Sequence, residues 1–297
     1  MQRAGIRIGD DSPTGYGSIS KLEVHQPPGH PELLVFVSDV SIACGEDSSL
    51  YVFERHENGW RMAIVIETNG YTQVKDALGD LHYGISPADS QGRWFLVYEH
   101  DYPWCTSAWN GIEYWVVRPG KSADHPSVVV TGTEQMYFYD DTLPRLRVGR
   151  DGFHLDFNAG YMSDKGPLTW IGVVRYRIED NRAIRISPLA SSPEGFLAEW
   201  RNIPWPDAAR WSKAGLRATQ RWHQMLRSPT LYPEFKFVQP CPDKNRWQIG
   251  LSLDPVKDGS SEKSQPMFVT LIKTAQSYSL VQIGPARPPG CPGETQP

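Results

Sequence analysis

The stretch LYVFERHENGWRMAIVI, residues 50–66, contains the turn signal from which the fold prediction starts. Runs rich in β-branched, aromatic and aliphatic residues flank Asn58 and Gly59 on both sides. An Asn-Gly pair supplies the positive φ angles that a two-residue hairpin turn needs, and the flanking runs suit a half-buried pleated surface. Residues 50–66 therefore predict a β-hairpin.

Comparable turn signals recur along the chain at intervals of roughly 30 residues, each between two apolar or aromatic runs. They are Asn58-Gly59, Gly92, Asp124, Asp151-Gly152, Asp180-Asn181, Asn245 and Gln276. A series of hairpins predicts an all-β, mainly antiparallel fold. We favour a propeller-like arrangement, because units that are neighbours in sequence are usually neighbours in space; a β-sandwich is the alternative.

One interval is about twice as long as the others, and the sequence inside it has a helical period. Ser192, Pro193 and Glu194 form a helix-start signal. Serine can accept a bond from a free backbone N–H, proline is tolerated in the first turn, and a carboxylate is favoured at the positive end of the helix dipole. A short helical insert over residues 192–228 is predicted to replace one hairpin.

The predicted organisation is one β-rich domain over residues 17–284 that includes the insert. Residues 1–16 are polar and Gly-rich, and they contain no apolar segment of the kind found in signal peptides. Residues 285–297 are dominated by Pro and Gly, a composition typical of a surface tail.

Composition excludes several classes of protein. The chain has 297 residues, of which 39% are hydrophobic and 11 are Trp, so it can bury a substantial core. No run approaches the roughly 20 apolar residues of a membrane-spanning helix. The formal net charge of −4 gives no general attraction to nucleic acid. No cofactor motif or metal-ligand spacing is present, and oligomeric state cannot be read from the sequence.

Four cysteines occur outside any Cys-x-x-Cys or zinc-finger spacing. We expect two disulfides, Cys44 with Cys105 and Cys241 with Cys291, each stabilising by about 4 kcal/mol in the chain-entropy model. Disulfides indicate a secreted or periplasmic protein; four reduced thiols in a cytoplasmic protein are the alternative.

A disulfide between Cys44 and Cys105 would bring Glu46 and Asp47 near the segment that runs from Glu99 to Trp109. The proposed binding residues in these loops are Trp104, Trp109, Asp101, Glu46 and Asp47. Aromatic rings pack on the apolar side of a sugar, and carboxylates accept hydrogen bonds from its hydroxyls. The loops therefore predict a surface that binds a glycan or a protein partner.

Two functions remain open from the sequence. The first is a non-catalytic binding module for a glycan or protein partner, favoured because no catalytic motif is recognisable. The second is a glycoside-type hydrolase that uses a pair of carboxylates among Glu46, Asp47, Glu99 and Asp101, since glycosidases commonly use two such groups. The sequence does not decide whether the protein is an enzyme.

Overall fold

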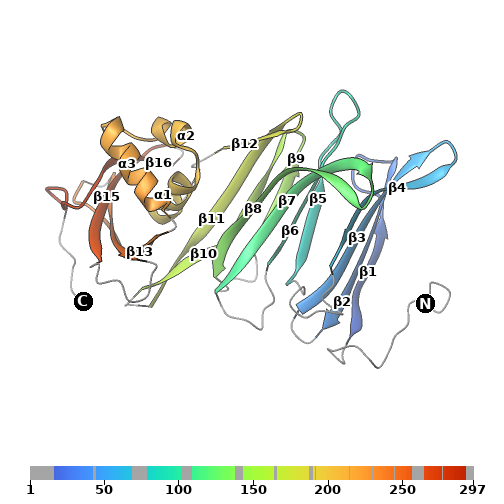
Figure 1. The fold of residues 1–297 in the computed structure, drawn as a ribbon, viewed down its shortest axis with the longest axis horizontal. Helices are drawn as coiled ribbons and strands as arrows, with labels where there is room; N and C mark the ends of the chain where they lie inside the picture. Colours follow the sequence, from blue (N-terminus) through green and yellow to red (C-terminus); the bar gives the residue numbers. More distant parts are fainter. Residues whose placement is uncertain are drawn as a thin grey trace. The chain divides into compact units, whose positions relative to one another are not determined.

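The computed structural model shows a mainly antiparallel β fold with a helical insert (Figure 1). It describes residues 17–42, 45–68, 79–101, 109–137, 143–163, 166–186, 190, 192–213, 215–228, 230–243, 245–255, 264–275 and 277–291. These residues form four sheets of four strands each.

Each sheet is a meander in which strands that follow one another along the chain are paired. The first sheet contains β1 (Ser18–His25), β2 (Leu33–Ile42), β3 (Gly45–His56) and β4 (Gly59–Glu67). The second contains β5 (Leu81–Ile85), β6 (Leu96–Asp101), β7 (Trp109–Ser122) and β8 (His125–Tyr137). The third contains β9 (Arg145–Gly149), β10 (Gly152–Ser163), β11 (Gly166–Glu179) and β12 (Arg182–Arg185). The fourth contains β13 (Leu231–Pro240), β14 (Arg246–Pro255), β15 (Gln265–Lys273) and β16 (Tyr278–Gly284).

The predicted fold class is confirmed, including the serial hairpins. Asn58 lies between β3 and β4, Asp124 between β7 and β8, and Asn245 between β13 and β14. Gly59 and Asp180 have φ angles of 119° and 50°, so two of the turns use the left-handed backbone region. Gln276 lies outside the described residues. The four-stranded meander is the arrangement of a propeller blade.

The chain divides into two compact units. The first unit comprises residues 1–138, 146–153 and 177–183, and the second comprises residues 139–145, 154–176 and 184–297. The division falls within β9, β10, β11 and β12, the four strands of the third sheet. A single domain over residues 17–284 stays a prediction.

The core of the first unit lies between its first and second sheets. Strand β2 alternates strictly, with Leu33, Val35 and Val37 almost fully buried and the residues between them half-buried. These side chains pack with Leu50, Val52, Ile64, Leu81, Trp94, Leu96 and Val117. Each such side chain stabilises the fold by about 1.5–3 kcal/mol when it is fully buried.

The helical insert forms three helices in the second unit: α1 (Pro193–Asn202), α2 (Trp205–Arg210) and α3 (Leu216–Leu226). The predicted start is confirmed, since Ser192 Oγ accepts a hydrogen bond of 3.1 Å from the Gly195 N–H. Trp200 is fully buried and donates to the carbonyl of Ala208 at 3.0 Å. Phe196 packs on Tyr278 of β16, so the insert docks on the fourth sheet.

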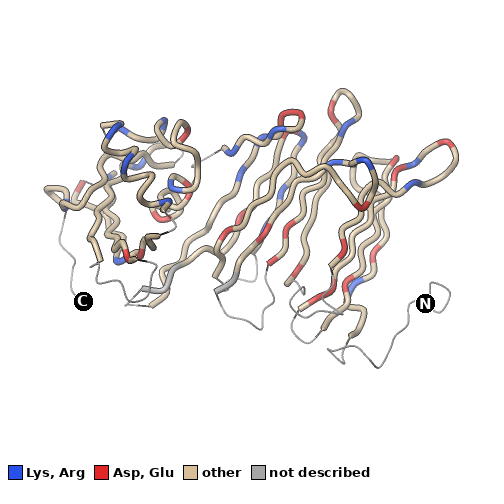
Figure 2. The backbone as a smooth tube through the Cα atoms, viewed as in Figure 1, with Lys and Arg blue, Asp and Glu red and all other residues tan. Residues whose placement is uncertain are grey.

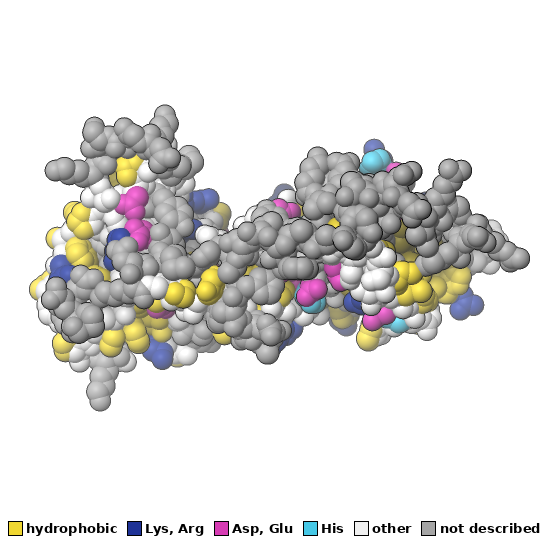
Figure 3. All heavy atoms as spheres, turned by 90° about the horizontal axis from the view of Figure 1, so that it is seen from below, with side chains coloured by type: hydrophobic (Ala, Val, Ile, Leu, Met, Phe, Trp, Pro, Cys, Tyr) yellow, Lys and Arg dark blue, Asp and Glu magenta, His cyan; other side chains and the backbone are white. Residues whose placement is uncertain are grey.

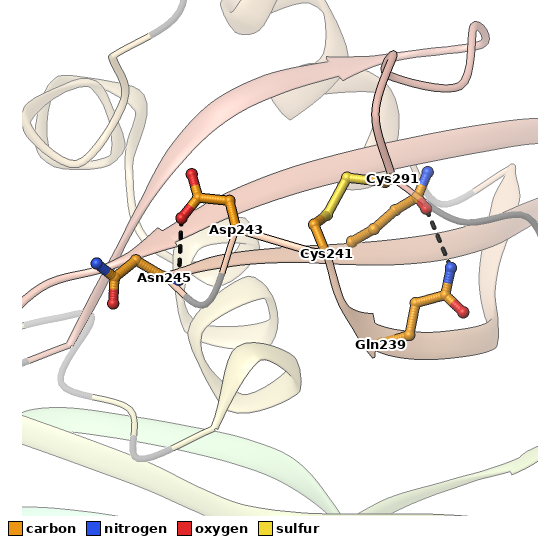
Figure 4. The surroundings of a disulfide bond; sticks show 6 residues. Gln239, Cys241, Asp243, Asn245 and Cys291 are labelled. Atoms are coloured by element: carbon orange, nitrogen blue, oxygen red, sulfur yellow. Dashed lines mark hydrogen bonds between the residues drawn. A yellow bond between two sulfur atoms is a disulfide. The ribbon is translucent and has the colours of Figure 1, made fainter.

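A disulfide joins Cys241, which follows β13, to Cys291, which lies beyond β16 (Figure 4). It is the pairing that the sequence favoured for these two cysteines. The cross-link ties together the segments next to the first and last strands of the fourth sheet. Cys44 and Cys105 lie outside the described residues.

Of the helices in the described ranges, none combines the length and the apolar character needed to cross a membrane.

A small side chain at position 132 is required by the ring of Tyr114, which pairs with Gly132 across β7 and β8. A Cβ at Gly132 would overlap the Tyr114 phenol. We expect Gly132→Ala to destabilise the protein by about 1–3 kcal/mol, because overpacking forces neighbouring groups to move. Urea unfolding measures the change. Gly149→Ala is the strand control, since its Cβ would meet its nearest neighbour at 3.6 Å; equal losses in the two variants would contradict the expectation.

Candidate functional site

Strand β6 divides the polar groups of the second sheet between its two faces. Leu96 belongs to the core shared with the first sheet, so Tyr98 and His100 face the same way. Glu99 and Asp101 face the opposite side. Acidic residues recur along the strands of the first two sheets, whereas lysines and arginines mark the helical insert (Figure 2).

Glu99 is fully buried, and its contact is with a histidine on the neighbouring strand. His82 on β5 is its direct partner in the register, and His82 Nδ1 lies 2.9 Å from Glu99 Oε1. The distance is that of an ion pair, although the atoms are not aligned as a hydrogen bond. The Glu99 carboxylate raises the pKa of His82, while burial raises the pKa of Glu99. Glu99 Oε2 has no hydrogen-bond partner among the described residues.

Asp101 is the second buried carboxyl on this face, with 2% of its surface exposed. Burial raises its pKa from 3.8 to about 7, and the negative charges of Asp80 and Glu99 add to the shift. Its Oδ1 has no hydrogen-bond partner within the described ranges. Its backbone carbonyl accepts a bond of 2.7 Å from the Gly79 N–H. Asp101 is therefore a carboxyl that keeps its proton at much higher pH than an exposed aspartate.

The opposite face of β6 borders a cavity of about 190 Å³ between the first and second sheets. The second sheet contributes Tyr98, His100 and Trp115, and the indole of Trp115 stacks on both other rings at centroid distances of 5.0 Å. The remaining lining residues are Ser48, Ile66, Glu67, Thr68 and Leu81. The cavity thus has a wall of stacked rings together with hydroxyl and carboxylate groups.

Near the cavity, toward the end of β2 and the start of β3, polar residues take the place of the apolar core residues of the first sheet. Asp39 continues the buried alternation of β2, and its pKa is raised by burial. Thr68 Oγ1 donates to Asp47 Oδ1 at 2.8 Å and accepts from the Ser48 N–H at 2.9 Å. Figure 3 shows the molecule from below, with acidic side chains next to histidines on the described surface.

The structure separates the candidate residues named from the sequence. Glu46 and Asp47 are adjacent on β3 and so face opposite sides of that strand. Ser20 Oγ donates to Glu46 Oε1 at 3.2 Å, and burial followed by the charge of Asp39 raises the pKa of Glu46. Asp101 faces away from the first sheet. Trp104 lies outside the described residues, as does the side chain of Trp109. A shared binding surface of these five residues stays a prediction.

Sequence reasoning missed His82, Tyr98 and Trp115. Each lies on a strand whose alternation is visible in the sequence. Their partners are set by the register between strands, which places His82 opposite Glu99 and Trp115 opposite Tyr98. No pattern along a single strand reports that pairing.

No group of three or more His, Cys, Asp and Glu side chains in the described part of the chain is arranged to hold a metal ion.

The sequence matches no protein-family model and no curated protein. Among solved structures, that of a thermostable family-43 glycoside hydrolase is similar at 10% identity, covering 94% of this chain and 98% of that one, with a TM-score of 0.22. A TM-score this low does not establish a common fold, and we draw no conclusion from it.

The buried Asp101 should make stability depend on pH. Its carboxyl ionises near 3.8 in the unfolded chain and near 7 in the folded protein, so the folded state holds more protons between these values. Wild-type stability should therefore fall across this window, by at most roughly 1.4 kcal/mol per pH unit. Asp101→Asn should remove this dependence.

Urea midpoints of both proteins at pH 4 and pH 8 measure the effect. Glu57→Gln, in the exposed turn between β3 and β4, is the control and should behave as wild type. Parallel pH dependence in wild type and Asp101→Asn would contradict the assignment.

Proposed function

We propose that the first unit binds glycans, with one sugar ring in the cavity between its first and second sheets. The observation behind the proposal is the stacked wall of Tyr98, Trp115 and His100 opposite the hydroxyls of Ser48 and Thr68. Aromatic rings pack on the C–H face of a sugar, and the polar groups orient its hydroxyls.

The size of the cavity favours a glycan over a protein partner. At about 190 Å³ it is smaller than the roughly 300–1,000 Å³ typical of sites for drug-sized molecules, and it is hollow rather than flat. A protein partner usually needs about 800 Å² of surface on each side. A single ring at the end or side of a glycan chain matches the cavity better.

Trp115→Ala should weaken glycan binding at least tenfold, because it removes the ring that stacks on both Tyr98 and His100. Glu67→Gln is a milder change at the exposed edge of the cavity and should weaken binding less. A glycan array selects the ligand, and isothermal titration calorimetry gives the dissociation constants.

Trp60→Ala is the matched control, since Trp60 is 45% exposed and lies outside the cavity. Thermal melts show whether each variant is folded. Absence of any bound glycan, or equal binding by folded Trp115→Ala and wild type, would refute the proposal.

A second candidate is glycoside-type hydrolysis at the carboxyl cluster on the other face of β6. It is favoured by the pKa of Asp101, raised to about 7 by burial, because a carboxyl that keeps its proton near neutral pH can act as a general acid.

If Asp101 donates the proton, Asp101→Asn should lower kcat by about 10²–10⁴ while KM changes little. The wild-type rate should also decline as pH rises through about 7, because the acid form is lost. Release of reducing sugar from a panel of polysaccharides measures both. Glu57→Gln should match wild type, and wild-type activity in Asp101→Asn would exclude this role.

The disulfide between Cys241 and Cys291 supports an oxidising compartment. We infer that the protein is secreted or periplasmic. Recovery of this disulfide by non-reducing peptide mapping of protein from its native compartment tests the inference.

A further inference from the structure

We propose that His82 is the proton acceptor of the carboxyl cluster and that Glu99 is the residue that positions it. The proposal rests on the hydrolase function above. It assigns the base to an imidazole, where the sequence predicted a pair of carboxylates.

The two strands fix this pair through their backbones. His82 and Glu99 stand directly opposite each other in the antiparallel register of β5 and β6. The side chain of Glu99 is fully buried, whereas that of His82 is 43% exposed. Because no side-chain hydrogen bond or other ion pair of Glu99 is found within the described ranges, a charged Glu99 depends on His82 for compensation. His82 is therefore the member of the pair that is in contact with solvent.

The orientation of the ring determines which atom can react. Nδ1 lies against Glu99 Oε1, which favours the tautomer with the proton on Nδ1. Nε2 is then the unprotonated ring nitrogen, and its lone pair can accept a proton. When Nε2 takes up a proton, the imidazolium is stabilised by the negative charge beside it.

The negative charges around His82 favour its uptake of a proton. The Glu99 carboxylate raises its pKa most, burial opposes that effect, and the charge of Asp80 raises the pKa further. The shift is upward from the ordinary histidine pKa of 6.5, so His82 binds a proton more tightly than an exposed histidine does. His82 becomes neutral, and able to accept a proton, when the pH rises above this raised pKa, and Asp101 retains its proton up to about pH 7.

The hydrolytic step balances with water as the only co-reactant. His82 Nε2 takes a proton from water, the water oxygen bonds to the anomeric carbon, and the bond from that carbon to the leaving oxygen breaks. The leaving oxygen takes the proton of Asp101. The proton on His82 then returns to Asp101 through solvent, so that one water is consumed and both groups are restored.

The competing interpretation is a cross-strand ion pair that only stabilises the second sheet. His82→Gln and Glu99→Gln separate the two interpretations. His56→Gln is the matched control, because His56 is also half-exposed beside a glutamate, with Nε2 3.9 Å from Glu54 Oε2.

Two measurements are needed. NMR titration of the imidazole nitrogens should show the Nδ1–H tautomer of His82 in the wild type and a lower His82 pKa in Glu99→Gln. In reducing-sugar assays, His82→Gln should lower kcat at least 100-fold, and Glu99→Gln should shift the acidic limb of the pH–rate profile to lower pH. His56→Gln should change neither.

The outcomes distinguish the inference from the function on which it rests. Wild-type turnover that persists in folded His82→Gln overturns the inference alone. Absence of turnover in the wild type overturns the hydrolase function together with the inference. An unchanged His82 titration in Glu99→Gln overturns the positioning role of Glu99.

Discussion

The burial of β6 on both faces is the constraint on which the candidate site depends. Five of its six residues are buried and Tyr98 is partly buried, because the strand lies inside the second sheet and packs against the first. Any polar side chain on β6 must therefore give up its contact with water. The carboxyl groups of Glu99 and Asp101 lie in that environment. Because burial disfavours the charged form, the pKa values of both are raised. Burying a carboxyl without a full set of hydrogen-bond partners costs stability, and this is why the proposed proton chemistry is placed at these two groups.

Polar side chains lie in buried positions on both sides of β6. Toward the first sheet, the apolar core of Val37, Leu50 and Leu96 changes to Asp39, Ser48 and Thr68 as the strands end, and the aromatic cavity lies there. On the other side, Glu99 lies against His82, and Asp101 is buried on the same face of the strand. The two places differ in what they offer to a ligand. The cavity is lined by rings and hydroxyl groups, whereas the His82 side contains an imidazole and two buried carboxyl groups with raised pKa values.

The second unit is stabilised in another way. Its fourth sheet is covered by the helical insert, in which Trp200 is buried and the Nε2–H of His223 donates to the carbonyls of Trp200 and Ile203. Those carbonyls lie near the end of α1, where helix geometry leaves them without partners. Burial lowers the pKa of His223. Together with the disulfide at Cys241, these contacts hold the insert and the sheet in place, and they explain the aromatic spacing of the insert as packing.

The sequence by itself determined the periodic parts of this protein. Turn chemistry such as Asn58-Gly59 gave the serial hairpins, and the change of period after Ser192 gave the helical insert, because both signals are local and need only a few neighbouring residues. The candidate site is different. The sequence identified Glu46, Asp47 and Asp101 as groups able to bind a ligand or transfer a proton. It did not show which side of the sheet each of them faces, and it did not point to His82. A pairing such as His82 with Glu99 depends on strand register, and a raised pKa such as that of Asp101 depends on what covers the side chain. Both are set by contacts between residues distant in the chain, so only the tertiary structure decided them.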